Sequence, residues 1–177
     1  QIHGGAIIRL HHDGSIPKDN PRLDGWAPEI FSIGHRNPQG LAFHPSTGAL
    51  WSHEHGPRGG DEINIITAGD NYGWPTVSHG KEYIGGTIGI GTSAPGLADP
   101  AWVWTPSIAP SGMAFYRGPM FPQLNGHLLV GSLKFKRLYL VKLSAGVPQD
   151  EFVILDGSIG RVRDVAVGSD GAILLLS

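Results

Sequence analysis

Hydrophobic residues along this chain come in short runs, and turn-forming residues separate one run from the next. The runs have the length of β-strands and are rich in Val, Ile, Leu and aromatic residues. The segments "HDGS", "STGA", "AGDN" and "SDGA" between them have turn chemistry. No window of 12 or more residues keeps helical apolar spacing without Gly or Pro. The pattern predicts an all-β protein with strands within residues 5–10, 40–45, 49–54, 62–67, 112–116, 127–133, 137–143, 152–156, 162–168 and 172–177.

Three of these segments repeat one plan. Residues 40–51, 112–131 and 164–176 each contain an apolar-Ala-apolar strand, a turn with Gly and a second apolar strand. The central alanines, Ala42, Ala114 and Ala166, are 72 and 52 residues apart. A multi-strand repeat of roughly 40–50 residues is typical of a β-propeller. The longer interval contains residues 76–100, a Gly-rich segment with little strand pattern. A Greek-key sandwich is the alternative, but it does not predict the repeat.

The composition excludes several classes of function. The net charge of the 177 residues is -2 and no long run of like charge occurs, so nothing favours a nucleic-acid or membrane-surface partner. No apolar stretch approaches the roughly 18–20 residues of a membrane-spanning helix. The chain has no cysteine, which excludes disulfides and thiolate chemistry. Glycine and proline together supply 41 of the 177 residues, as expected of a folded protein rich in turns.

Both ends of the sequence indicate a piece of a longer protein. The chain begins at Gln1 without Met, and it stops at "AILLLS", inside a strand pattern. A natural domain seldom ends within its own strand. We therefore expect an incomplete domain over residues 1–177. A mature chain with a frayed terminus is the alternative.

The first candidate site is the segment "GHRNPQG" at residues 34–40. Arg36 and Asn37 stand just before a proline, which pushes the preceding residue into an extended conformation. An extended arginine on a loop can present its guanidinium to a ligand. A solvated arginine in a turn explains the same residues.

The second candidate site is the segment "EHGPRGGDEIN" at residues 54–64. The carbonyl groups of Gly56 and Pro57 are hard oxygen ligands of the kind that calcium prefers, and Asp61 and Glu62 are neighbouring carboxylates. The spacing of these acids does not match an EF-hand loop. A Gly-rich turn whose acids cap backbone amides is the alternative.

Other catalytic and metal motifs find less support. His53 and His55 flank Glu54, and in a strand their rings would lie on one face. No HExxH motif and no cysteine pair accompanies them, so a zinc site is not predicted. The chain also lacks the GxSxG elbow of Ser-His-Asp hydrolases.

Three further cations lie in the last third of the chain. They are Lys134, which follows "GSL", and Arg161 and Arg163 in "GRVRD". Strand alternation puts the two arginines on the same side. Like charges side by side repel, so this arrangement requires either an anion between them or solvent around them.

The combination of motifs resembles one family. "GHRNPQGLAF", "EHGPRGGDEIN", "NYGWP", "APSGMAFY", "GSLK" and "RVRDV", in this order, resemble the soluble quinoprotein aldose sugar dehydrogenases of the glucose/sorbosone dehydrogenase family. The resemblance covers essentially the whole chain. It implies part of a six-bladed β-propeller, with about three to four blades present and the N-terminal blades missing. It also implies two cofactors, pyrroloquinoline quinone (PQQ) and calcium (Ca2+).

The resemblance assigns expected roles to particular residues. Arg36 and Asn37 would face the quinone oxygens, three cations would neutralise the PQQ carboxylates, and two backbone carbonyls would hold calcium. Tyr83 and Ser107 lie in loops that vary within the family. A second, structural calcium site would use Glu62 and the backbone of Tyr72. The implied cofactor-binding residues are Arg36, Asn37, His55, Tyr83, Ser107, Lys134, Arg161 and Arg163, and the implied metal-binding residues are Gly56, Pro57, Glu62 and Tyr72.

The implied reaction is oxidation of an aldose at its C1 hydroxyl, with hydride transfer to PQQ and electrons passed to an external acceptor. Arg36 would act electrostatically. The family's histidine base belongs to an earlier blade and no histidine here matches it, so the 177 residues are not expected to turn over alone. A periplasmic or secreted location follows from the resemblance alone, and a homodimer is an open option. A non-catalytic binding propeller and a calcium-dependent lactonase-type propeller are the alternative functions.

Overall fold

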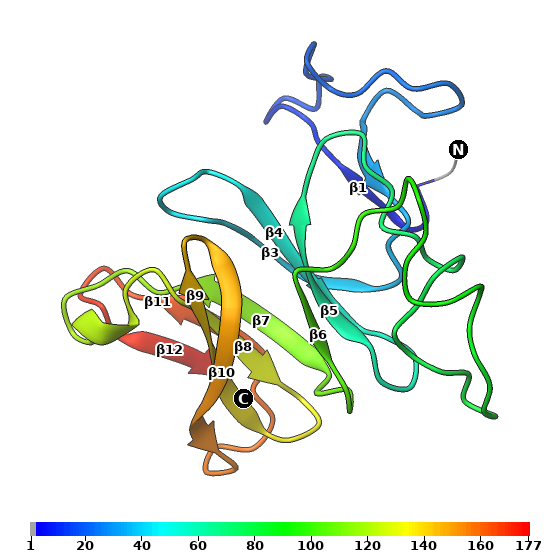
Figure 1. Ribbon diagram of the computed structural model, residues 1–177. Helices are drawn as coiled ribbons and strands as arrows, with labels where there is room; N and C mark the ends of the chain where they lie inside the picture. The colour runs from blue at the N-terminus through cyan, green and yellow to red at the C-terminus, as the bar shows by residue number, and fades with distance from the viewer. Residues whose placement is uncertain (1–2) are drawn as a thin grey trace.

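The computed structural model describes residues 3–177, and it confirms the all-β prediction (Figure 1). Twelve strands and one short 3-10 helix are present, and no α-helix occurs within residues 3–177. The same residues contain no helix with the length and apolar character required to span a bilayer. The strands are β1 (Ala6–Ile8), β2 (Ile30–Ile33), β3 (Pro38–Phe43), β4 (Leu50–Glu54), β5 (Asp61–Ile66), β6 (Trp102–Trp104), β7 (Pro110–Phe115), β8 (Leu128–Ser132), β9 (Arg137–Ser144), β10 (Val147–Asp156), β11 (Asp164–Val167) and β12 (Ile173–Leu176), with the 3-10 helix η1 (Pro122–Leu124) before β8.

The strands form four antiparallel sheets. Two sheets have four strands each, β3-β4-β5-β6 and β7-β8-β9-β10, and two have two strands each, β1-β2 and β11-β12. Neighbours in each sheet are consecutive in the chain, which is the meander of a propeller blade. The two four-stranded sheets lie next to each other in Figure 1.

The sequence repeat marks equivalent strands. Ala42, Ala114 and Ala166 lie in β3, β7 and β11, the first strands of three successive sheets. β7 packs against both β3 and β11. The repeated strands are therefore the ones at which neighbouring sheets meet, as the propeller prediction requires.

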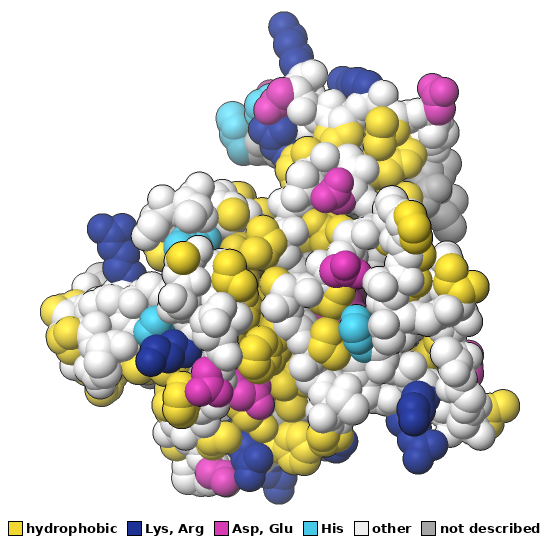
Figure 2. All heavy atoms as spheres, in the orientation of Figure 1, with side chains coloured by type: hydrophobic (Ala, Val, Ile, Leu, Met, Phe, Trp, Pro, Cys, Tyr) yellow, Lys and Arg dark blue, Asp and Glu magenta, His cyan; other side chains and the backbone are white. Residues whose placement is uncertain are grey.

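Apolar side chains between neighbouring sheets hold the blades together. Figure 2 shows hydrophobic side chains reaching the surface in the region between the two four-stranded sheets. Burying one large aliphatic or aromatic side chain stabilises the fold by about 1.5–3 kcal/mol, so the blade contacts are the main source of stability. The core between the four-stranded sheets contains Trp51, Ile63, Trp104, Ile108, Met113, Leu128, Val130, Tyr139, Val141 and Leu143. A second core, which includes Tyr116, Leu129, Leu138, Leu140, Val162 and Val165, joins β7–β10 to β11–β12.

Two strands escaped the sequence prediction. β2 and β6 have only four and three residues, and neither shows an alternating pattern with turn residues at both ends. They form because they pair with strands that lie far away in the sequence: β2 pairs with β1, and β6 pairs with β5. Residues 76–100 form a long loop without a strand, as the sequence indicated.

Candidate functional site

The predicted site residues gather at one end of the blades. Arg36 and Asn37 directly precede β3, Ser107 precedes β7, and Arg161 and Arg163 precede β11. These three strands are equivalent in successive blades and run in the same sense through the propeller. Residues just before them therefore lie on the same face of the molecule.

Strand pairing brings four more candidates to the same face. Pro38 at the start of β3 pairs with Glu54 at the end of β4, so His55, Gly56 and Pro57 follow at that end. Pro110 at the start of β7 pairs with Ser132 at the end of β8, so Lys134 also follows there. We call the set Arg36, Lys134, Arg161 and Arg163 the cationic end.

The cationic end has no acidic partners of its own. The ion pairs within residues 3–177 join other residues: His3 with Glu29, Arg9 with Asp19, His35 with Glu54 and Arg137 with Asp156. Arg161 and Arg163 are both exposed on either side of the fully buried Val162, in the segment that directly precedes β11 and not within a strand. Four cations on one face that form no ion pair with a carboxylate among residues 3–177 are suited to a ligand that carries several negative charges.

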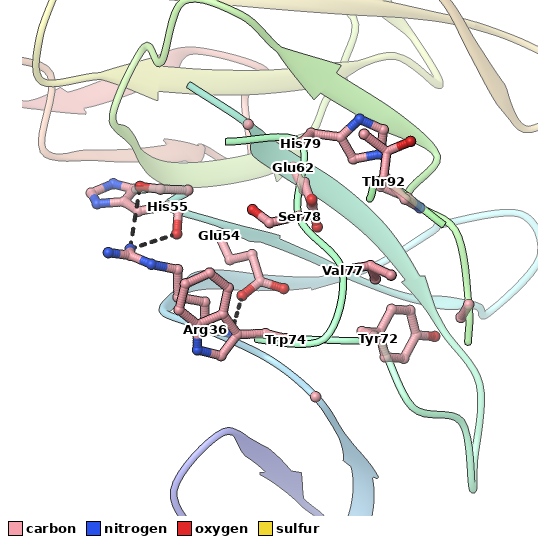
Figure 3. A pocket seen from close by; sticks show the side chains of 15 residues that line it. Arg36, Glu54, His55, Glu62, Tyr72, Trp74, Val77, Ser78, His79 and Thr92 are labelled. Atoms are coloured by element: carbon pink, nitrogen blue, oxygen red, sulfur yellow. Dashed lines mark hydrogen bonds between the residues drawn. The ribbon is translucent and has the colours of Figure 1, made fainter. Parts of the chain in front are cut away.

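Arg36 is fixed by its neighbours (Figure 3). Its Nη1 donates hydrogen bonds to the carbonyl oxygens of His55 at 2.9 Å and Gly56 at 3.2 Å. The guanidinium carbon lies 5.2 Å from the ring centre of Trp74, a cation–π distance. Trp74 had no assigned role in the sequence analysis, and its only signal was its place in the "NYGWP" motif.

Close packing explains the glycines of residues 54–64. A Cβ on Gly56 would lie 2.3 Å from the carbonyl oxygens of Gly59 and Gly60, a distance that no side chain tolerates. A Cβ on Gly60, whose φ is +72°, would lie 2.4 Å from the amide nitrogen of Gly80. The turn therefore folds tightly on itself and against the long loop at residues 76–100.

Asp61 caps backbone amides, which is the alternative that the sequence left open. Its Oδ1 accepts a hydrogen bond from the Gly56 N–H at 2.9 Å and from the Ser107 hydroxyl at 2.8 Å. Its Oδ2 accepts one from the Ala109 N–H at 2.8 Å. The Ser107 hydroxyl in turn accepts the Gly59 N–H at 3.0 Å. Asp61 is thus a structural clamp between the turn and the start of β7.

The side chain of His55, which follows β4, contacts the first residue of β7 in the neighbouring sheet. Its Nε2 donates a hydrogen bond to the carbonyl oxygen of Pro110 at 2.7 Å. A cofactor contact from this ring would therefore use the other ring nitrogen, Nδ1.

Glu62 and Tyr72 line a small cavity together with Arg36, Glu54 and Gly56. The cavity has a volume of about 20 Å³, enough for one water molecule or one metal ion. Burial, with the negative charge of Glu54 and then Asp61 nearby, raises the pKa of Glu62 to about 8. A cation in the cavity would relieve this cost, because opposite charge favours the ionised carboxylate.

The ligands available for a metal are mainly backbone oxygens. Residues 3–177 contain no cluster of three or more His, Asp or Glu side chains that could hold a metal ion. The Tyr72 hydroxyl donates to the carbonyl oxygen of Ile65 at 2.6 Å and accepts the Thr67 N–H at 2.9 Å. With its phenol engaged in this way, Tyr72 would contribute its backbone carbonyl, as expected.

Tyr83 lies apart from the other candidates. It is 68% exposed and belongs to a tight turn closed by the Glu82 N–H and the Gly86 carbonyl at 3.1 Å. Tyr83 is absent from the lining of the cavity that Arg36, Gly56, Glu62 and Tyr72 share.

A buried polar network next to the backbone of Arg36 was not predicted from the sequence. Glu54, His35, Asn64 and Ser32 are almost fully buried and are joined by hydrogen bonds. Glu54 and Asn64 belong to the second candidate segment, but no role followed from their spacing. Neither residue stands out in the sequence, because β4 also contains Ser52 and His53 and β5 also contains Asp61 and Glu62.

Comparison with known proteins agrees with this geometry. The chain is 43% identical over 177 residues to the aldose sugar dehydrogenase YliI of Escherichia coli, covering 98% of this chain and 48% of that protein. It is 31% identical over 224 residues to quinoprotein glucose dehydrogenase B of Acinetobacter calcoaceticus, covering 96% of this chain and 47% of that protein. The chain thus spans about half the length of the curated relatives it matches.

Solved structures give the same result. The crystal structure of the soluble aldose sugar dehydrogenase of Escherichia coli in its apo form superposes with a TM-score of 0.92 at 43% identity, covering 97% of this chain and 51% of that one. The PQQ-bound aldose sugar dehydrogenase of Streptomyces coelicolor superposes with a TM-score of 0.77 at 30% identity, covering 98% and 46%. The sequence model of the Glucose / Sorbosone dehydrogenase family matches residues 1–177. The chain therefore belongs to the Glucose / Sorbosone dehydrogenase family.

Proposed function

We propose that this chain is the half of a PQQ-dependent aldose sugar dehydrogenase that carries the cofactor-binding cations. The observation that supports this most is the cationic end, in which Arg36, Lys134, Arg161 and Arg163 share one face without an acidic partner among residues 3–177. A non-catalytic binding propeller has no need for four unpaired cations at the ends of equivalent strands. A lactonase-type propeller would need metal-binding side chains in place of these cations.

The residues present suit PQQ. The cofactor carries three carboxylates, and Lys134, Arg161 and Arg163 would bind them, since charge-assisted hydrogen bonds are the strong ones. Arg36 and Asn37 would lie at the quinone oxygens, where a fixed guanidinium stabilises developing negative charge. Bound PQQ would supply an ortho-quinone that accepts a hydride from the C1 carbon of the sugar.

Calcium would bind at two places. Gly56 and Pro57 would offer backbone carbonyls beside Arg36, in a turn that has no room for side chains at Gly56. Glu62 and the backbone of Tyr72 would hold a second, structural ion in the cavity of about 20 Å³. Burial and the neighbouring Glu54 and Asp61 raise the pKa of Glu62 to about 8, and a bound cation would favour its ionised form.

The substrate would be an aldose sugar, oxidised at C1 to the lactone, and the electrons would leave to an external acceptor. The general base would come from the blades that precede this chain, so we expect residues 1–177 alone to be inactive. We expect a periplasmic or secreted location, on the ground of the family resemblance alone. A homodimer is compatible with the half-propeller.

The experiment is a titration of the complete protein with PQQ, followed by absorbance, with calcium and with a chelator. We expect saturable binding that requires calcium. Replacing Arg161 and Arg163 by Gln should weaken binding by about 100-fold or more, because two charge-assisted contacts are lost. Arg22→Gln, at an exposed position outside the cationic end, is the control. Absence of saturable binding would favour the non-catalytic or lactonase-type propeller.

A further inference from the structure

Glu54 is a buried carboxylate with donors on every side. It ends β4, is 4% exposed and does not belong to the cationic end. Its Oε2 accepts hydrogen bonds from the backbone N–H of Arg36 at 2.6 Å and of Asn37 at 3.1 Å. Its Oε1 accepts one from Asn64 Nδ2 at 3.0 Å.

These bonds replace strand pairing at the point where β3 begins. The register between β3 and β4 shifts between Pro38 and Gly40, and Pro38 has no N–H to donate. Without Glu54, the amides of the half-buried Arg36 and of the exposed Asn37 would have no strand partner, and an unpaired amide shielded from water is costly. The Glu54 carboxylate satisfies both and fixes the path of the backbone that carries Arg36.

A second layer of residues holds Glu54 itself. The His35 Nδ1 lies 3.2 Å from Glu54 Oε1, and the His35 Nε2 lies 2.9 Å from the Ser32 hydroxyl. The His35 ring stacks on the ring of Tyr72 with 4.6 Å between centroids. Since an ionised carboxylate only accepts, the His35 Nδ1 is the donor to Glu54, and the Nε2 pairs with the Ser32 hydroxyl, which can donate or accept. His35 and Asn64 therefore orient one oxygen of the carboxylate, while the other oxygen holds the backbone of Arg36 and Asn37.

The Arg36 side chain is then fixed at both ends. Glu54 anchors its backbone, while the His55 and Gly56 carbonyls and the Trp74 ring hold its guanidinium. The Arg36 guanidinium lies at the end of a long side chain, so a displacement of the Arg36 backbone would also displace this charged group. Figure 3 shows the Glu54 carboxylate beside the start of Arg36, while the guanidinium at the other end of the side chain points toward His55.

We propose that Glu54, supported by His35, is the positioning residue that sets the place of the Arg36 guanidinium and the Asn37 amide relative to the cofactor. This inference rests on the proposed function. Glu54 would act through the backbone of Arg36 and Asn37, to which its carboxylate is bonded, and not by binding the cofactor itself. Its side chain is required as a carboxylate, because all of its neighbours at hydrogen-bonding distance are donors.

The test compares Glu54→Gln with the wild type in the complete protein. The amide group of Gln has the size of the carboxylate, but its NH2 must face either the Arg36 and Asn37 amides or the Asn64 amide. Glu54→Asp, which keeps the charge and shortens the side chain, is the second variant if Gln prevents folding. Glu82→Gln removes an exposed acid from the long loop and serves as the charge-matched control.

Two measurements are made on each variant. The first is hydrogen exchange of the Arg36 and Asn37 amides without PQQ, where we expect exchange to be at least about 10-fold faster in Glu54→Gln. The second is steady-state kinetics with PQQ and calcium, where we expect kcat to fall by about 10–100-fold with little change in the KM for the aldose. In an Arg36→Ala background, the same Glu54→Gln change should alter kcat by no more than about twofold, because coupled residues are not additive.

The amide exchange and the kinetics together show whether Glu54 positions Arg36. Faster amide exchange with a loss of kcat that disappears in the Arg36→Ala background supports the inference. Unchanged exchange, unchanged kcat, or an equal loss in both backgrounds overturns it while the proposed function stands. A wild-type protein that takes up no PQQ overturns the proposed function and this inference with it.

Discussion

Replacing Asp61 by Asn tests the clamp that joins the candidate loop to the next blade. The carboxylate accepts the Gly56 and Ala109 amides and the Ser107 hydroxyl at 2.8–2.9 Å. Asn keeps one oxygen, which can still accept from Gly56 and Ser107. Its NH2 then faces the Ala109 N–H, so that donor loses its partner and the remaining bonds lose their charge.

The size of the effect follows from these contacts. Losing one charge-assisted hydrogen bond and leaving its buried donor unpaired costs about 1.5–3 kcal/mol, and weakening the other two adds about 1 kcal/mol. We therefore expect the free energy of unfolding to fall by about 2.5–4 kcal/mol. Asp24→Asn, an exposed acid in an early loop, should change it by less than about 0.5 kcal/mol.

The assay is urea unfolding of the complete protein, followed by fluorescence and circular dichroism, with the slope m compared between variants. A loss below about 1 kcal/mol for Asp61→Asn at unchanged m would show that the carboxylate does not clamp the two blades.

Three further predictions concern the site and its surroundings. Arg36→Ala in the complete protein should lower kcat by at least about 100-fold while sugar affinity changes by less than about threefold, measured by steady-state kinetics; an unchanged rate would remove Arg36 from the mechanism. Calcium should raise the thermal midpoint of the PQQ-free protein, and Glu62→Gln should reduce that rise, whereas an equal rise in both would place calcium elsewhere. Burial lowers the pKa of His53 to about 4, so the neutral ring is favoured in the fold. The resulting stability, at most about 3 kcal/mol, is present above pH 6.5 and lost as the pH falls toward 4. His53→Gln should flatten the curve of unfolding free energy against pH between about pH 6.5 and 4. A curve identical to that of the wild type would show that His53 does not cause this loss of stability.

The sequence predicted the architecture well because the blades repeat. Ala42, Ala114 and Ala166 recur in strands with one shared plan, and the structure places them in β3, β7 and β11. Short strands were harder to find: β6 has three residues and depends on pairing with β5, which local pattern does not reveal.

The site was only partly visible in the sequence. Arg161 and Arg163 were expected to point the same way within a strand; the structure begins β11 only at Asp164, and the two exposed arginines flank the buried Val162 just before it. Asp61 had two readings, calcium ligand or amide cap, and only its partners 46 and 48 residues away distinguish them. Glu54 was missed for the same reason, since its role depends on amides 17 and 18 residues earlier in the chain.

The most direct test of the central claim is a crystal structure of the complete protein with PQQ and calcium. The account predicts that oxygen atoms of PQQ lie at about 3 Å from the side-chain nitrogens of Arg36, Lys134, Arg161 and Arg163. It also predicts calcium at the Gly56 and Pro57 carbonyls. PQQ bound away from these four cations, or absent from crystals grown with both ligands in excess, would contradict it.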